Sequence, residues 1–322
     1  MNLLFKKPSL ETKIAKSKIA LGENIFDESP EEIAISKIKK VTGHEFSHLT
    51  NSGNNSIFLA LSQVKGDIII PDQGGWNGFK QIARLLNKNI HTLKTDLGII
   101  NPEDISDLEL SHKSAIIFTS FAGYTAEQDI KAISTYCHDN AITVIEDCSG
   151  GICDNEKKLG NGKLSDILIA STGSPKMINV GNGGFISYNN PKIFDEIKIP
   201  LKISKCDDIT ACGIATEIDF THNNFKETVK ASEYLKNNLE NVIHQEKRGL
   251  NVIIKSNNPK KLSFNLKNEL PLDEKSFFTK CPNYNRVKEK AVAIELKNLE
   301  ISSLIKENLD IIIEKVNDYY GS

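Results

Sequence analysis

Short apolar runs alternate with amphipathic stretches over the first two thirds of the chain. Runs with the length and composition of buried strands occur at 67–70 (DIII), 90–94 (IHTLK), 114–118 (SAIIF), 142–146 (ITVIE), 167–170 (ILIA) and 184–187 (GFIS). Apolar residues at helical spacing lie before or between several of these runs, at 31–41, 55–64, 77–87 and 126–139. Short buried strands that alternate with helices predict an α/β fold whose large, mostly parallel sheet is covered on both faces.

The pattern changes towards both ends of the chain. Residues 1–30 contain Pro8, Gly22 and Pro30, and we expect them to be irregular. The alternation stops near Pro200. Beyond it, helical patterns cover 224–242 and 303–318, and strand-like runs cover 251–255, 262–266 and 290–296. We therefore expect an N-terminal arm (1–30), a large domain (31–200) and a smaller α+β C-terminal domain (201–322).

Composition narrows the class of protein. Of the 322 residues, 39% are hydrophobic and 25% are charged, and the 40 basic and 42 acidic side chains give a net charge of -2. We expect neither a nucleic-acid nor a membrane partner, because there is no excess of basic residues and no apolar stretch long enough to span a bilayer. The six cysteines are scattered, without metal-ligand spacing, so we expect no metal site and a cytoplasmic protein with reduced thiols.

Polar residues follow several of the expected strands, at the edge where parallel sheets of this class bind ligands. Ser52, Gly53, Asn54 and Asn55 precede an apolar helix, whose free N–H groups and dipole favour a bound phosphate. Taken alone, this segment is better explained as an ordinary N-cap. Asp147 ends the strand ITVIED, where a carboxylate can pair with a protonated pyridine nitrogen, although turn and cap residues are also common there.

A lysine lies in the loop after the strand ILIA. Lys176 follows Ser171 and Ser174 and precedes the glycine-rich run 181–184, so hydroxyls that bind phosphate and an amine that forms an imine are close in sequence. A surface lysine is the simpler explanation for Lys176 on its own. Trp76, the only tryptophan, follows the strand DIII and either stacks on a bound ring or packs in the core.

Taken together, these segments resemble the DegT/StrS family of aminotransferases, which have the type I fold of enzymes that depend on pyridoxal 5′-phosphate (PLP). The matching stretches are NSGNNSIFLAL, GDIIIPDQGGW, FAGYTAEQD, VIED and SPKMINVGNGGFIS, which together span about 31–190. The resemblance implies that Lys176 holds PLP as a Schiff base and that Asp147 contacts the pyridine nitrogen. It also implies that the phosphate binds near Ser52, Gly53, Asn54, Asn55, Ser171 and Ser174.

The resemblance further implies an enzyme that acts as a homodimer and moves an amino group from an amino acid donor to a keto acceptor, a class that includes keto sugars. The chain departs from the family pattern in three places. Gly150 stands where Gln or His usually lies near the phenolic oxygen of PLP, Asn54 replaces a threonine, and the part after residue 200 is short and matches poorly. We therefore expect an acceptor pocket unlike that of typical sugar aminotransferases.

Alternatives remain at this stage. A PLP-dependent lyase or desulfurase acting on a sulfur amino acid would use a thiol such as Cys281, although an incidental buried cysteine is the simpler explanation. A degenerate relative without catalytic activity is also compatible with the changes at Gly150 and in the C-terminal part. Arg286 is the candidate clamp for a substrate carboxylate, against the alternative of a solvated arginine.

Overall fold

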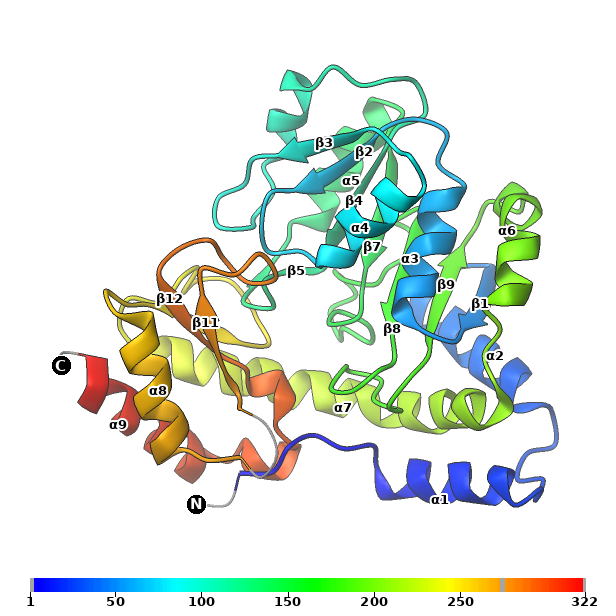
Figure 1. The fold of residues 1–322 in the computed structure, drawn as a ribbon. Helices are drawn as coiled ribbons and strands as arrows, with labels where there is room; N and C mark the ends of the chain where they lie inside the picture. The colour runs from blue at the N-terminus through cyan, green and yellow to red at the C-terminus, as the bar shows by residue number, and fades with distance from the viewer. Residues whose placement is uncertain (1–2, 273–275, 321–322) are drawn as a thin grey trace.

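The structure is a computed structural model that describes residues 3–272 and 276–320. A seven-stranded sheet has the order β1-β9-β8-β7-β4-β2-β3 (Figure 1). Its strands are β1 (Phe46–Thr50), β2 (Ile68–Pro71), β3 (Ile90–Leu93), β4 (Ala115–Thr119), β7 (Thr143–Asp147), β8 (Ile167–Ser171) and β9 (Gly184–Tyr188). The six expected strands are present, and β1 is an addition. Neighbouring strands are parallel except at β9, which is antiparallel to both β8 and β1.

Both faces of the central strands are buried, which explains why β2, β4 and β8 are nearly continuously apolar rather than alternating. On β4, Ile116 and Phe118 belong to one core, and Ala115 and Ile117 belong to the other. Helices α2 (Pro30–Thr42), α5 (Ile130–Asp139) and α7 (Asp208–Asn238) contribute to the first core. Helices α3 (Gly53–Ser62), α4 (Asn77–Leu85) and α6 (Lys192–Ile203) contribute to the second. The expectation of an α/β fold with a large, mostly parallel sheet is confirmed.

The expectation that residues 1–30 are irregular is wrong, because they include helix α1 (Leu10–Ala20). Ser9 caps this helix by accepting a hydrogen bond from the Thr12 amide. The hydroxyls of Ser9 and Thr12 also donate to the Glu217 carboxylate on α7, at 2.7 Å each. Figure 1 shows α1 running beside α7. The helix is held by polar contacts and has a weak apolar stripe, which is why its hydrophobic pattern did not reveal it.

A second, antiparallel sheet lies in the C-terminal part. Its order is β10 (Val252–Lys255), β12 (Ala291–Ile294) and β11 (Phe278–Cys281), and α8 (Pro259–Glu269) and α9 (Lys306–Tyr320) pack on it. The strand expected at 262–266 is wrong, because these residues lie within α8. Asn258 caps that helix and Pro259 opens it, and both are typical helix-start residues.

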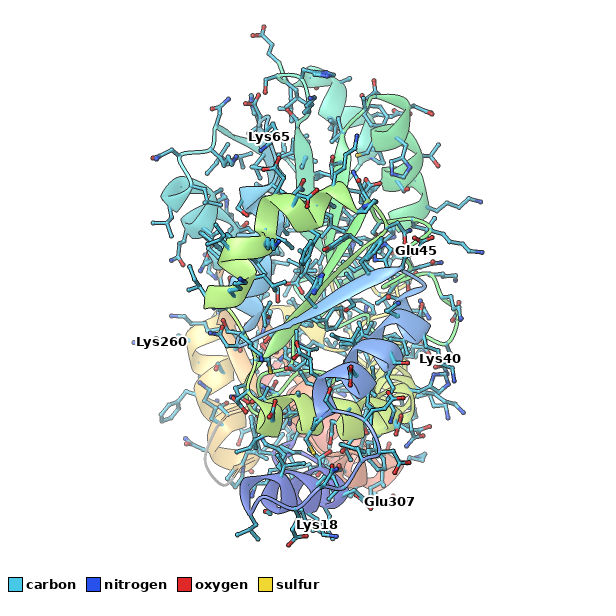
Figure 2. The ribbon with its side chains drawn as sticks, turned by 90° about the vertical axis from the view of Figure 1, so that its right-hand side faces the viewer. Lys18, Lys40, Glu45, Lys65, Lys260 and Glu307 are labelled. Atoms are coloured by element: carbon cyan, nitrogen blue, oxygen red, sulfur yellow. The ribbon has the colours of Figure 1, made fainter. Side chains whose placement is uncertain are left out.

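The remaining short elements are the hairpin strands β5 (Phe121–Ala122) and β6 (Ala126–Glu127), and the 3-10 turns η1 (Pro102–Asp107), η2 (Leu296–Asn298) and η3 (Ile301–Ser303). Charged side chains such as Lys18, Lys40 and Lys65 point away from the ribbon (Figure 2). Within residues 3–272 and 276–320, no helix has the length and apolar character needed to cross a membrane.

Candidate active site

The ends of several strands meet around one cavity of about 400 Å³. Strands β4, β7 and β8 are parallel, so their carboxyl ends lie at one edge of the sheet. Strand β1 points the same way as β8, because both are antiparallel to β9, and it brings the start of α3 to the same edge. The C-terminal part adds a further wall to the cavity, which includes Asn285, Arg286 and Lys297.

The first turn of α3 lies directly against Ser171. A Cβ atom at Gly53 would lie 2.4 Å from the Ser171 Cβ, so only glycine fits there. The Ser52 hydroxyl accepts from the Asn55 amide at 3.3 Å and caps the helix. In this segment, the Ser52 hydroxyl and the Asn55 amide are therefore already hydrogen-bonded to each other. Gly53 and Asn54 both line the cavity, and the first amides of a helix have no partner within the helix itself.

Trp76 lies at the mouth of the cavity, not in the core, and 41% of its surface is exposed. Its indole nitrogen donates to the Asn54 side chain at 3.0 Å, which ties the start of α4 to the start of α3. A Cβ atom at Gly78 would lie 2.3 Å from that nitrogen, so glycine leaves the room that the indole needs. The core-packing alternative is therefore removed, and a flat aromatic ring faces the cavity.

Asp147 is almost fully buried at the end of β7, and it lines the same cavity. Its Oδ1 atom accepts from the Ser149 hydroxyl at 2.5 Å and from the Ser149 amide at 3.0 Å. The Ser149 hydroxyl in turn accepts from the Ser171 amide at 2.8 Å, which joins the ends of β7 and β8. Oδ2 has no partner in the described part of the chain, so it is free to bind a ligand group. Glu146, one residue earlier, points away and is held in the core by Ser120, Gly160 and Ser165.

The Lys176 amine lies in the cavity and hydrogen-bonds the Tyr124 hydroxyl at 2.6 Å. Burial lowers the pKa of Lys176, but Tyr124 and Asp147 together outweigh it, so the pKa lies above its ordinary value. Ser174 lines the cavity beside Lys176. The four regions expected from sequence, which are the start of α3, Trp76, Asp147 and the Lys176 loop, therefore converge in space.

Arg286 lines the cavity, but its guanidinium is already engaged. Nε and Nη2 donate to the two carboxylate oxygens of Glu295 at 2.6 and 2.8 Å, and Nη1 donates to the Asn285 carbonyl at 2.6 Å. Burial raises the pKa of Glu295, but Arg286 and Lys297 outweigh it and lower the pKa to about 2. Arg286 thus mainly neutralises a buried carboxylate, and the solvated-arginine alternative does not hold.

The sequence analysis missed several residues in the cavity wall, of which Tyr124 and Lys297 matter most for the chemistry. Tyr124 belongs to the hairpin between β5 and β6, and Lys297 belongs to η2. Tyr124 was part of a quoted family stretch, FAGYTAEQD, but nothing in the sequence singled it out. Lys297 is one lysine among many, and only the packing of the second sheet brings it to the cavity.

Cys281, the candidate thiol of the lyase or desulfurase alternative, is fully buried in β11. Burial raises its pKa, which disfavours the reactive thiolate. It lines none of the central cavity. The structure therefore gives no support to a nucleophilic role for this cysteine.

Comparison with known proteins identifies the family. The model of the DegT/DnrJ/EryC1/StrS aminotransferase family matches residues 27–225. The chain belongs to this family. A second model, the MJ1341 family C-terminal domain, matches residues 222–317. The family expected from sequence is confirmed, and so is the expectation of a PLP-dependent aminotransferase.

Solved structures agree in fold along nearly the whole chain. A DegT DnrJ EryC1 StrS aminotransferase from Brucella abortus has a TM-score of 0.76 and 14% identity, over 97% of this chain and 96% of that one. A putative sugar aminotransferase of Streptococcus pneumoniae in its PMP form has a TM-score of 0.78 and 12% identity, over 98% of each chain. The Helicobacter pylori aminotransferase PseC, involved in pseudoaminic acid biosynthesis, has a TM-score of 0.75 and 10% identity over both full chains.

The side chains around the cavity fit PLP. The cofactor carries an aldehyde, a pyridine nitrogen and a phosphate, and these need an amine, a carboxylate and N–H donors. Lys176, Oδ2 of Asp147 and the backbone amides at the start of α3 supply all three around a single cavity. The glycine at position 53 also keeps the helix start open, where any side chain would collide with Ser171.

Proposed function

We propose that this chain is an aminotransferase that carries PLP as a Schiff base on Lys176 and transfers an amino group from an amino acid donor to a keto acceptor. The observation that carries the proposal is the convergence of Lys176, Asp147 and the start of α3 on one cavity. These groups come from three separate strand ends, and each matches a different functional group of the cofactor. A protein that binds no cofactor would have no structural reason to bring these three groups together.

In this proposal each residue has a distinct role. Bound PLP supplies a pyridine ring that withdraws electrons from the α-carbon of the amino acid. Oδ2 of Asp147 keeps the ring nitrogen protonated, and Ser149 fixes the carboxylate through Oδ1. The Lys176 amine is the general base that removes the proton from the α-carbon of the substrate, and then the general acid that returns a proton to a nearby atom. The amides of Gly53 and Asn54, with Ser171 and Ser174, hold the phosphate, and Trp76 covers the ring.

The charge on the cavity wall favours a substrate with a carboxylate. When Lys297 is protonated, Arg286 and Lys297 carry two positive charges against the single negative charge of Glu295. The Lys297 amine lies 3.7 Å from Glu295 and 4.8 Å from the centre of the Tyr124 ring. The Lys297 amine donates to the Asn298 side chain at 2.7 Å and has further N–H donors, whereas Arg286 is held by Glu295 and the Asn285 carbonyl. We therefore assign the direct contact with the donor carboxylate to Lys297 and a supporting role to Arg286. Glutamate is the donor to test first.

The acceptor is a keto compound, and a keto sugar is the first class to test. One of the similar structures is named a putative sugar aminotransferase, and another takes part in pseudoaminic acid biosynthesis. A small keto acid is the competing class, since Lys297 and Arg286 also favour a carboxylate on the acceptor. A panel that contains both classes separates them by kcat/KM.

We also propose that the enzyme is a cytoplasmic homodimer. All six cysteines are free and most are buried, which suits a reducing compartment. The exposed Trp76 at the cavity mouth leaves room for a partner subunit to complete the site. Light scattering of the purified protein tests the dimer, which requires a mass close to twice the 35.7 kDa of one chain.

Reduction with borohydride tests the central proposal. The protein is incubated with PLP, reduced and digested, and the peptides are mapped by mass spectrometry. The pyridoxyl group should appear on Lys176, and Lys176→Ala should abolish the label. Lys290→Ala, which changes an exposed lysine outside the cavity, serves as the control. A label on another lysine, or a lack of conversion to pyridoxamine phosphate with every amino acid of a donor panel that includes glutamate, contradicts the proposal.

A further inference from the structure

Tyr124 occupies an unusual position beside Lys176. It lies in the turn of the β5–β6 hairpin, where Gly123 and Tyr124 have φ angles of +57° and +63°. A bulky residue rarely adopts a positive φ, because its Cβ crowds the backbone, and the cost is of order 1–3 kcal/mol. Glycine or asparagine would form this turn more easily. A tyrosine at this position therefore suggests that its side chain contributes something that the turn itself does not require.

The surrounding structure holds this turn in place. The Tyr124 carbonyl accepts from the amides of Leu250 and Asn251, at 2.8 and 3.0 Å. The ammonium of Lys236 donates to the Thr125 carbonyl at 2.8 Å. A Cβ atom at Gly123 would lie 2.9 Å from the Arg286 carbonyl, so the turn is pressed against the C-terminal part. The ring of Tyr124 is thus placed by contacts from both halves of the chain.

Gly150 leaves the room that this ring occupies. A Cβ atom on Gly150 would lie 3.0 Å from Cε1 and 3.2 Å from Cδ1 of Tyr124, and 3.1 Å from Cδ1 of Leu250. A Cβ at position 150 would therefore crowd the tyrosine ring, which would have to shift from its present place. The tyrosine ring can lie where it does because position 150 has no side chain.

The Tyr124 hydroxyl contacts the Lys176 amine, the group that would bond to the cofactor. It lies 2.6 Å from the Lys176 amine, and the ring is also faced by the Lys297 amine and the Arg286 guanidinium. In PLP the aldehyde carbon and the phenolic oxygen sit on adjacent ring atoms. A hydroxyl within hydrogen-bond reach of the amine that binds the aldehyde is therefore near the phenolic oxygen as well.

We propose that Tyr124 takes the place of a side chain at position 150 and donates a hydrogen bond to the phenolic oxygen of PLP bound at Lys176. This inference rests on the proposed function, because it requires PLP on Lys176. The hydrogen bond stabilises the negative charge of the phenolic oxygen, which is greatest when the linkage at Lys176 has lost its proton. The donor therefore keeps the linkage unprotonated to lower pH than it would otherwise be.

The test is a pH titration of the visible absorption of the reconstituted protein, which requires no turnover. In Tyr124→Phe, PLP should still map to Lys176, but the midpoint of the spectral change should move up by about one to two pH units, as the loss of one hydrogen bond to a charged group predicts. Tyr136→Phe removes a phenolic hydroxyl outside the central cavity and should leave the midpoint unchanged.

A double variant tests the exchange between the two positions. Tyr124→Ala alone should show the raised midpoint. Tyr124→Ala combined with Gly150→Gln should lower it again, because the cleared space accepts a side chain with an N–H donor. If Tyr124→Phe does not retain PLP, this pair of variants still tests the exchange. Recovery of the midpoint, or of PLP retention, when Gly150→Gln is added to Tyr124→Ala supports it.

The outcomes separate this inference from the proposed function. An unchanged midpoint in Tyr124→Phe, with PLP on Lys176, overturns the role of Tyr124 and leaves the aminotransferase proposal standing. No difference between Tyr124→Ala and the double variant overturns the exchange between positions 124 and 150. A wild-type protein that does not form the linkage at Lys176 overturns the proposed function itself.

Discussion

Lys297 is the residue through which we expect pH to act on substrate binding. It is buried in the cavity wall, and burial lowers its pKa to about 7, against the opposing attraction of Glu295. Above that pH the amine is mostly neutral and binds a carboxylate less well. We therefore predict that the KM for the amino donor rises from pH 7 to pH 9, while kcat changes less. Steady-state kinetics at several pH values measure both constants.

Substitution of Lys297 makes the same prediction sharper. Lys297→Met should raise the donor KM at pH 6.5 about ten- to a hundredfold, the cost of losing one hydrogen bond to a charged group, and should flatten its pH dependence. Glu295 keeps its partner Arg286, so the fold should survive, which circular dichroism checks. Lys290→Met, on the exposed surface, is the matched control. A normal KM in Lys297→Met would place the donor carboxylate elsewhere.

Residues at strand ends were predictable from sequence, and residues brought in by tertiary packing were not. The approach of Ser171 to the start of α3 follows from parallel strands, whose carboxyl ends must share an edge. The positions of Tyr124 and Lys297 depend instead on a short hairpin and on the docking of the second sheet. The pairing of Arg286 with Glu295 was also hidden, because strand β12 lies between them in the chain.

At the scale of elements, strong apolar patterns predicted well and weak ones did not. Six of the seven strands of the large sheet were found within one residue or so, because they are strongly apolar, whereas the more polar β1 was missed. Helix α7 begins at Asp208, far before the expected residue 224. Its first half contains Gly213 and several threonines, which are poor helix formers, and packing overrides that preference. At Gly213 the helix approaches Val180 closely, where a Cβ atom would lie 3.1 Å from the valine Cβ.

At the scale of the whole molecule, α7 joins the two sheets. Ala211 to Phe225 contribute to the core of the large sheet, and Ala231 and Leu235 contribute to the core of the second. The two family matches meet at residues 222–225, in the middle of this helix. The cavity takes Lys176 from one match and Lys297 from the other. Neither part alone therefore has a complete site, and the helix sets how the two walls face each other (Figure 1).

Three buried lysines, spread over the whole chain, predict how stability depends on pH. Burial lowers the pKa of Lys6 to about 8, of Lys236 to about 8 and of Lys297 to about 7, against partial compensation by acidic neighbours. All three pKa values lie below the ordinary 10.5, so the unfolded chain holds more protons than the folded one above pH 7 to 8. Stability therefore increases with pH in that window.

The increase ends where the thiols begin to ionise. Burial raises the pKa of Cys137 to about 12, above the ordinary 9.0, so the unfolded chain loses thiol protons first and stability falls above about pH 9. We predict that the unfolding free energy of the PLP-free protein rises by on the order of 1 kcal/mol per pH unit from pH 7 to about 9. Urea unfolding in the presence of a reductant, at pH 6, 7, 8 and 9, measures it.

Lys236 offers the variant that tests the cause of this rise. Its ammonium donates to the carbonyls of Thr125, His244 and Lys247, at 2.8, 2.7 and 2.7 Å. Lys236→Met should lower stability by about 2–4 kcal/mol, because these buried carbonyls lose their donor, and should make the rise with pH shallower, because one titrating group is gone. Lys260→Met, at an exposed position, should change neither quantity. Stability that falls steadily from pH 6 to 8 would show that other groups dominate the titration.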